Sequence, residues 1–294
     1  MQNGIERVSK IMMPILIVLS VIIAVYSVTR PGALAGVKYF LVPNVKNFSW
    51  MTVVSAMGQM FYSLSIAMGI LITFGSYMKK DTAIEDSTRN VEVFDTGIAI
   101  MAGLMIIPAV FAFSGGDPNT LQAGPSLMFI TIPKVFQNMG FGTVIGIVFF
   151  LLVLFAAVTS SIALTESAVS TFEDELGWGR KKATVLVGVI MLALGSLSSL
   201  GYGPLAGIKI IGMQFLDLFD FLTNSVMMPI AALLTSLFVS RVVGIDKIEA
   251  EIIHGESAFR RKKVFVVMIK YLCPVFAIII LLSSVANALG WIKM

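Results

Sequence analysis

The stretch of sequence that decides the fold is MTVVSAMGQMFYSLSIAMGILITFGSY, residues 51–77. It is long and apolar enough to cross a bilayer, which takes about 20 mostly apolar residues. Its middle, around Ser65–Gly69, gathers small and hydroxyl-bearing residues that weaken helix propensity near the expected midplane. A helix that opens there frees backbone carbonyls for a cation and presents half-helix dipoles to charged ligands. Close helix packing through Gly and Ser explains the same residues, and on this stretch alone packing is the favoured explanation.

The composition of the whole chain is typical of a membrane protein. Of its 294 residues, 57% are hydrophobic and 13% are charged. Soluble domains carry roughly 25% charged residues. A soluble fold of this size cannot hide so much apolar surface from water, whereas lipid can solvate it. We therefore predict an all-α, polytopic membrane protein in which residues 1–294 form a single transmembrane domain.

Seven apolar runs are candidates for transmembrane helices. They cover residues 11–28, 51–77, 96–113, 144–172, 185–200, 215–240 and 264–289. A further apolar stretch, Leu127–Phe136, is too short to span a bilayer and contains Pro133 and Lys134. We expect a loop helix on the surface there.

The Lys and Arg residues predict the orientation of the seven spans, because cytoplasmic loops carry an excess of both. Fourteen of the 21 lie on one side of the predicted membrane, including the clusters at 180–182 and 260–263, against six on the other. The N-terminus is therefore predicted to be cytoplasmic and the C-terminus external, in the plasma membrane. Seven-helix receptors of the G-protein-coupled kind have the opposite orientation. Short basic clusters between apolar runs face lipid headgroups more often than nucleic acid, so the bilayer is the expected partner and nucleic acid is not.

A second polar cluster lies in the fourth run, where Ala156–Ser161 is followed by Thr165 and Glu166. Adjacent hydroxyls and a carbonyl one turn earlier are hard oxygen ligands that suit a small cation such as sodium. Ser and Thr hydroxyls often bond back to the preceding helical turn instead. Glu166 is harder to explain without a specific role, since a carboxylate in an apolar span usually has a function or a partner. Asp95 and Asp220, at the beginnings of the third and sixth runs, are more simply explained as helix N-terminal acids.

An enzyme is not predicted. The sole histidine, His254, lies in a basic loop far along the chain from the intramembrane serines. The sequence contains no zinc-binding HExxH motif, no CxxC motif and no Gly-rich phosphate-binding loop.

Specific motifs follow one another along essentially the whole chain. They are GIER at 4–7, GQMFYSLS at 58–65, GSY at 75–77, IPAVF at 107–111, GPSLMFIT at 124–131, TSSIA at 159–163 and EDEL at 173–176. With these motifs in this order, the chain resembles the neurotransmitter:sodium symporter family, specifically its bacterial amino-acid transporters. The resemblance implies a LeuT-type fold, which is built from two inverted five-helix repeats.

The resemblance also implies a register. The GIER motif is similar to the beginning of the family's fifth helix, so the seven runs correspond to helices five to eleven. The chain is then expected to hold the complete second inverted repeat plus flanking helices, without helices one to four. The missing N-terminal helices or a second copy of the chain are the expected protein partners.

The resemblance implies roles for individual residues. The implied sodium ligands are Ser63 and Asp95 at one site, and the Ala156 carbonyl, Thr159 and Ser160 at a second. The implied substrate pocket is lined by Tyr62, Ser65, Met68 and Leu164. The implied external gate consists of Asp220 with Gln59 nearby. Ala67 departs from the family pattern, since a Gly is frequent at that position of the unwound segment.

The implied function is sodium-coupled symport of an amino acid, with Na⁺ as the co-transported ion and this chain as part of a complete transporter. The alternative is a non-transporting, truncated fragment of such a transporter. Three structural expectations follow. The second run should be interrupted between Ser65 and Gly69, and its hydroxyls should face those of Thr159 and Ser160. Asp220 should lack a basic partner, for which Lys209 is the sole candidate nearby.

Overall fold

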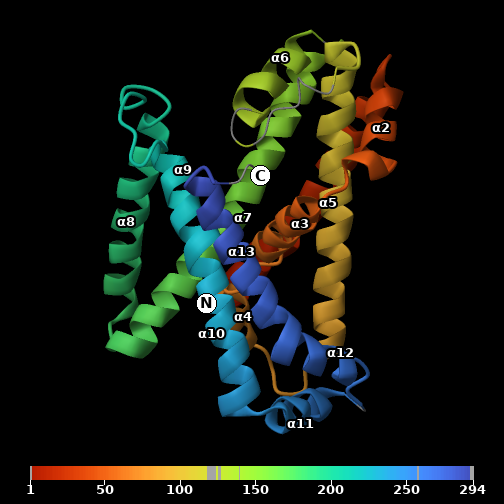
Figure 1. Ribbon diagram of the computed structural model, residues 1–294. Coiled ribbons are helices and arrows are strands. Elements are labelled where there is room, and N and C mark those ends of the chain that lie inside the picture. The colour runs from red at the N-terminus through yellow and green to blue at the C-terminus, as the bar shows by residue number, and fades with distance from the viewer. Residues whose placement is uncertain (1, 118–123, 125–126, 139, 257, 292–294) are drawn as a thin grey trace. The chain divides into compact units, whose positions relative to one another are not determined.

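The computed structural model describes residues 2–117, 124, 127–138, 140–256 and 258–291, most of them in helices (Figure 1). Six helices in this part of the chain are long and apolar enough to cross a membrane: Ser9–Val28, Ile84–Ser114, Gly142–Leu176, Arg180–Leu200, Phe215–Val243 and Lys262–Ala288. The predicted all-α, multi-pass membrane fold is confirmed. Most of these helices are longer than the predicted apolar runs, because the runs left out the polar turns at the ends of the helices.

The second predicted span consists of two short helices instead of one long helix. Helix α3 covers Trp50–Ser63 and α4 covers Ile70–Ser76. Between them, Ser65, Ala67 and Gly69 have φ angles of 53°, 64° and 78°. This left-handed conformation cannot continue a right-handed helix, and it disfavours residues that have a Cβ atom. The predicted interruption between Ser65 and Gly69 is confirmed, so the described chain has six long helices and one broken one.

Two helices near the C-terminal end contain wide π turns immediately before a proline. The π-helix η4 (Phe221–Met227) leads into α10 (Met228–Leu237), in which Pro229 is the second residue. Similarly, η6 (Met268–Leu272) leads into α13 (Cys273–Ala288), in which Pro274 is the second residue. Proline has no N–H group, and its ring clashes with the carbonyl four residues earlier. A π turn displaces that carbonyl, so both helices continue past their proline.

The chain divides into two compact units. The first unit comprises residues 1–48 and 92–162, and the second comprises residues 49–91 and 163–294. Helices α5 (Ile84–Ser114) and α7 (Gly142–Leu176) contribute residues to both units.

Among its described residues, the first unit contains four further helices and a short 3₁₀ turn: α1 (Gln2–Val28), α2 (Ala33–Leu41), η1 (Val45–Asn47), η3 (Leu127–Thr131) and α6 (Ile132–Gln137). Its buried core joins Ile23 of α1 to Met105 and Val110 of α5. Helix α2 lies directly against α5 at Gly36, where an added Cβ atom would be only 2.8 Å from Pro108 Cα.

The stretch Leu127–Phe136 was predicted to lie on the surface, and this prediction is wrong. Ile132, Val135 and Phe136 are 1%, 0% and 4% exposed and belong to the core of the first unit. Their spacing places all three on one face of α6. Pro133 lies in the first turn of that helix, where its missing N–H has no helical partner to lose. The helix therefore tolerates the proline that suggested a loop.

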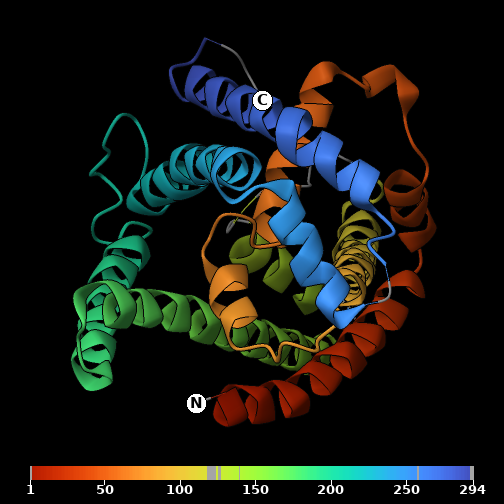
Figure 2. The same cartoon turned by 90° about the horizontal axis from the view of Figure 1, so that it is seen from below.

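The second unit contains the broken helix and the C-terminal helices. Its remaining elements are α8 (Arg180–Leu200), α9 (Phe215–Asp220), η5 (Phe238–Val243), α11 (Ile245–Gly255) and α12 (Lys262–Val267). Phe61 of α3 packs in a core with Met228 and Ala232 of α10 and Ala277 and Ile280 of α13. Helix α8 turns sharply away from the end of α7, and α11 lies crosswise to α10 (Figures 1 and 2).

Candidate substrate and cation site

Between α3 and α4, the backbone of Leu64–Gly69 does not follow the regular hydrogen-bonding pattern of an α-helix. Ile66, Ala67 and Met68 pack against the core that surrounds Phe61, so this segment is held in place. At its far end, Ser167 of α7 donates a 3.5 Å hydrogen bond to the Met68 carbonyl. A Cβ atom on the next residue, Gly69, would be only 2.8 Å from the Ser167 hydroxyl. The segment therefore passes very close to α7.

The four predicted pocket residues belong to the second unit. Ser65 and Met68 lie within the interruption and are partly buried. Tyr62, near the end of α3, is 52% exposed, and Leu164 of α7 is 47% exposed. That these four residues line a common substrate pocket stays a prediction.

The predicted sodium ligands are distributed over both units. Ser63 is the last residue of α3, in the second unit, while Asp95, Ala156, Thr159 and Ser160 belong to the first. The Thr159 hydroxyl donates back to the carbonyls of Phe155 at 3.1 Å and Ala156 at 2.9 Å. This is the local bonding that Thr commonly makes in helices. Because the hydroxyl is the donor, its oxygen lone pairs remain available to a cation. Sodium binding by these residues stays a prediction.

Two aspartates occupy different helical positions from those predicted. Helix α5 begins at Ile84, eleven residues before Asp95, and its first turn already contains Glu85 and Asp86. Asp95 is therefore not a helix N-terminal acid, because the helix starts well before the apolar run does.

Asp220 is not an N-terminal acid either, since it is the last residue of α9 and the chain continues into η4. Its Oδ1 atom accepts a 2.5 Å hydrogen bond from the Asn224 amide, one turn further on. Gln59, the second predicted gate residue, is exposed on α3. The gate function of this pair stays a prediction.

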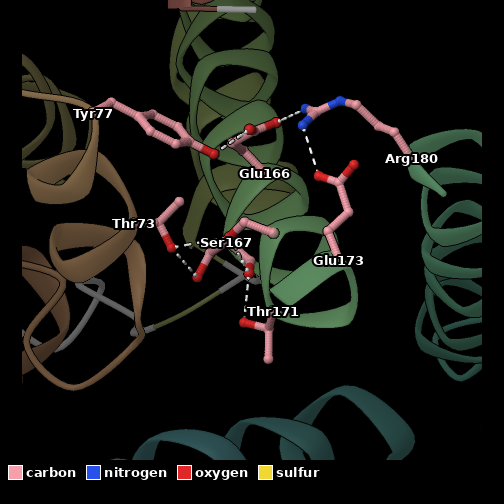
Figure 3. A network of polar contacts seen from close by, with 8 residues as sticks. Thr73, Tyr77, Glu166, Ser167, Thr171, Glu173 and Arg180 are labelled. Atoms are coloured by element: carbon pink, nitrogen blue, oxygen red, sulfur yellow. Dashed lines mark hydrogen bonds and ion pairs between the residues drawn. The ribbon is translucent and has the colours of Figure 1, made fainter. Parts of the chain in front are cut away.

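A polar network in the second unit surrounds the Glu166 carboxylate, which is 5% exposed (Figure 3). The Tyr77 hydroxyl donates to Glu166 Oε1 at 2.7 Å. Arg180 donates from Nη2 to Glu166 Oε2, and from Nη1 to Glu173 Oε2 at 3.0 Å. Tyr77 directly follows α4, and Arg180 is the first residue of α8. The network thus ties both elements to α7 and supplies the partners that a buried carboxylate needs.

Hydroxyl groups make further contacts between α4 and α7. The Thr73 hydroxyl lies 3.3 Å from the Ser170 hydroxyl and 3.5 Å from that of Ser167. Thr73 is buried, and so is Ser167. Together with the Tyr77–Glu166 bond, these contacts attach the second half of the broken helix to α7 along its length.

Glu166 could be singled out from the sequence, but its partners Tyr77 and Arg180 could not, nor could Glu173, which binds the same guanidinium. Arg180 was interpreted as part of the basic cluster that predicts orientation and that follows the EDEL motif, without an individual partner. The signal that points to it is its position just after a short turn, at the start of the helix that follows Glu166. Glu166 and Glu173 are seven residues apart, two turns on one face of α7, so one guanidinium reaches both.

The chain matches the model of the sodium:neurotransmitter symporter family over residues 1–291. The chain belongs to this family. Its members are secondary transporters and not enzymes, and sodium is the ion that they co-transport. The predicted resemblance is therefore confirmed at the level of the family and the LeuT-like fold.

The chain is similar to sodium-dependent transporters of two bacteria. It is 34% identical over 285 residues to YhdH of Bacillus subtilis, an uncharacterized sodium-dependent transporter, and the match covers 97% of this chain and 62% of YhdH. It is 31% identical to an uncharacterized sodium-dependent transporter of Haemophilus influenzae, with coverage of 96% and 61%.

A solved structure is similar as well. The chain superposes on the crystal structure of MhsT in complex with L-phenylalanine with a TM-score of 0.81 and 35% identity, covering 95% of this chain and 63% of MhsT. The chain thus spans slightly less than two thirds of the length of these relatives. Together these findings establish the family, and they do not favour the non-transporting alternative.

Proposed function

We propose that this chain takes part in sodium-coupled symport of an amino acid across the plasma membrane. The observation that carries the proposal is the interruption at Leu64–Gly69, which is bounded by two half-helices in a member of a sodium symporter family. Broken helices of this kind expose carbonyls and helix ends that bind ions and charged substrate groups near the midplane. An amino acid carries both an ammonium group and a carboxylate, so it suits such a segment.

An amino acid is the proposed substrate for a second reason. The structurally similar protein MhsT is in complex with L-phenylalanine in its crystal structure. Tyr62, Ser65, Met68 and Leu164 are the proposed lining of the pocket, and the first two bring hydroxyls that can bind polar groups.

The proposed sodium ligands are oxygen atoms, as a hard monovalent cation requires. Ser63 and Asp95 would hold one ion. The Ala156 carbonyl with the hydroxyls of Thr159 and Ser160 would hold a second. Asp220 and Gln59 would act at the external gate.

The proposed register assigns the chain to family helices five to eleven. It is supported by the order of the motifs and by the position of the broken helix, which comes second in the chain as the family's sixth helix would. With this register the N-terminus is cytoplasmic and the C-terminus external, in agreement with the distribution of Lys and Arg. The chain would then act together with four further helices.

Sodium-dependent stabilisation by amino acids tests the proposal. The chain is fused behind the first four helices of YhdH, and the melting temperature is measured in detergent with each of the common amino acids in NaCl or in KCl. We expect at least one amino acid to stabilise the protein in NaCl only, because a ligand that binds the folded state alone raises its stability. The response should disappear in Thr159→Ala and persist in Ser198→Ala, whose hydroxyl bonds to its own helix at Leu194. Equal stabilisation in KCl would contradict sodium coupling.

A further inference from the structure

The beginning of α5 interlocks with the segment that follows α11, and both belong to the second unit. Glu256 comes directly after α11, and its Oε1 atom accepts hydrogen bonds from the backbone N–H groups of Glu85 at 2.5 Å and Asp86 at 3.3 Å. These N–H groups belong to the first turn of α5, where no partner exists within the helix. A carboxylate from a distant segment therefore caps the positive end of the α5 dipole.

The contact is reciprocal, because the first turn of α5 also supplies a carboxylate to the other segment. Glu85 Oε2 accepts a 2.9 Å hydrogen bond from the backbone N–H of Arg260. Its Oε1 atom lies 3.9 Å from Arg261 Nε, and the Glu85 side chain is only 10% exposed. Each segment thus satisfies backbone donors of the other with one glutamate. We call the four residues Glu85, Glu256, Arg260 and Arg261 the clasp.

Two neighbouring contacts hold the clasp closed. A Cβ atom on Gly255, the last residue of α11, would lie 2.5 Å from the Thr82 carbonyl oxygen, so the two backbones touch and no side chain fits between them. Lys262, at the start of α12, forms a 2.5 Å ion pair with Glu249 of α11. Opening the clasp would leave the first N–H groups of α5 unsatisfied and would remove a largely buried carboxylate from its guanidinium.

We propose that the clasp is a fixed joint that keeps the start of α5 together with α11, Glu256 and residues 260–262 throughout the transport cycle. Residues 77–83 form the loop that connects α4 to α5, so the joint anchors the end of this loop that leads into α5. It also fixes the beginning of the helix that carries Asp95. Glu85 and Glu256 are therefore positioning residues: they hold α5 without touching the substrate or the ion. The part of this inference that concerns transport rests on the proposed function, and the joint itself does not.

Hydrogen–deuterium exchange tests the joint without any transport assay. In Glu256→Ala we expect the amides of Glu85 and Asp86 to exchange about fivefold faster, the usual effect of removing a helix cap. In Glu85→Ala the Arg260 amide should respond in the same direction. The control is Glu251→Ala, on the exposed face of α11, which should leave all three amides unchanged. Unchanged exchange in both clasp variants would overturn the proposal.

Cross-linking then tests whether the joint stays closed during transport. The YhdH fusion carries Cys273→Ala, which removes this chain's one cysteine, and any cysteine in the added helices is also replaced. Glu85→Cys and Arg261→Cys are combined, and the two thiols are joined by a short bis-methanethiosulfonate linker. Sodium-driven uptake should fall at least threefold in the unlinked double variant and recover to at least half of the parent value after linking. The linker should not rescue Glu85→Cys alone.

Two outcomes of the cross-linking experiment would overturn the fixed joint. Uptake that is blocked by the linker and restored by its reduction would mean that the clasp must open. Uptake that is the same in the parent, the unlinked and the linked proteins would mean that the clasp positions nothing. If the parent shows no sodium-driven uptake, the proposed function fails, while the exchange experiment still decides whether the joint exists.

Discussion

Tyr77 and Glu166 lie 89 residues apart in the sequence, and the Tyr77 hydroxyl donates a 2.7 Å hydrogen bond to the Glu166 carboxylate. This bond joins the end of the broken helix to α7, and Arg180 binds the other oxygen of the same carboxylate. A carboxylate buried in an apolar helix is costly unless it is paired and hydrogen-bonded. The network therefore makes Glu166 compatible with its surroundings and fixes α4 at the same time.

The hydroxyl of Tyr77 should contribute measurably to stability. We expect Tyr77→Phe to lower the free energy of unfolding by about 2 kcal/mol, as is usual for a lost hydrogen bond to a charged group. Denaturant unfolding of the purified protein in detergent measures this difference. Tyr271→Phe is the matched control, because Tyr271 is 65% exposed and should change stability very little. Equal effects of the two substitutions would show that the Tyr77 bond is energetically unimportant.

The Arg180–Glu166 pair should show strong coupling in a double-mutant cycle. Arg180→Ala should cost about 2–3 kcal/mol, because it leaves a buried carboxylate without its cation. This is less than the roughly 3–5 kcal/mol usual for a fully buried pair, because the Arg180 side chain is 28% exposed and solvent screens the interaction. In a Glu166→Gln background the same substitution should cost less than about 1 kcal/mol. Lys181→Ala, one residue further along and exposed, serves as the control. Equal costs of Arg180→Ala in both backgrounds would contradict the pairing.

Ala67 holds a left-handed conformation, with φ of 64°, that glycine adopts freely. The strain in alanine is roughly 1–2 kcal/mol, which exceeds the ~0.8 kcal/mol that one buried methyl group contributes. We therefore expect Ala67→Gly to stabilise the protein slightly. Ala157→Gly, inside the regular helix α7, should instead destabilise it by about 0.5–1 kcal/mol. Thermal unfolding of both variants provides the comparison, and the same sign for both would show that the interruption is not strained.

Gly36 should tolerate no larger residue. A Cβ atom there would meet backbone atoms of Pro108 and Ile107 at 2.8 and 3.0 Å, and backbone cannot move aside as a flexible side chain can. Gly36→Ala should destabilise the protein by about 1–3 kcal/mol. Gly188 lies in α8, and a Cβ atom added to it would have no neighbour within 4 Å, so Gly188→Ala should be neutral or stabilising. Denaturant midpoints compare the two, and a neutral Gly36→Ala would contradict the close approach of α2 to α5.

The features that could be predicted from the sequence are those that depend on neighbouring residues. Apolar runs predict membrane helices wherever they occur. The small residues around Ser65–Gly69 make an interruption possible, although on this stretch alone helix packing is the favoured explanation. The family could be inferred because its motifs occur as short contiguous strings in a fixed order.

The features that could not be predicted depend on where helices begin and on which helices contact each other. Asp95 resembles a helix N-terminal acid because the polar first turns of α5 do not look like part of an apolar span. Arg180, one of the two partners of Glu166, was missed because it lies in another helix, beyond a turn whose geometry the sequence does not specify. The burial of Phe136 was missed because Pro133 and Lys134 obscured one apolar face of α6.

Radiolabelled amino-acid uptake into proteoliposomes tests the central claim, sodium-coupled transport, most directly. The protein is reconstituted as the 294-residue chain alone and fused behind the first four helices of YhdH, with an inward sodium gradient or with sodium equal on both sides. We predict gradient-driven accumulation by the fusion, lost in Thr159→Ala and Ser63→Ala and kept in Ser198→Ala, with none by the chain alone. Accumulation by the chain alone would show that its own helices suffice. Accumulation by the fusion that is equal with and without the gradient would contradict sodium coupling itself.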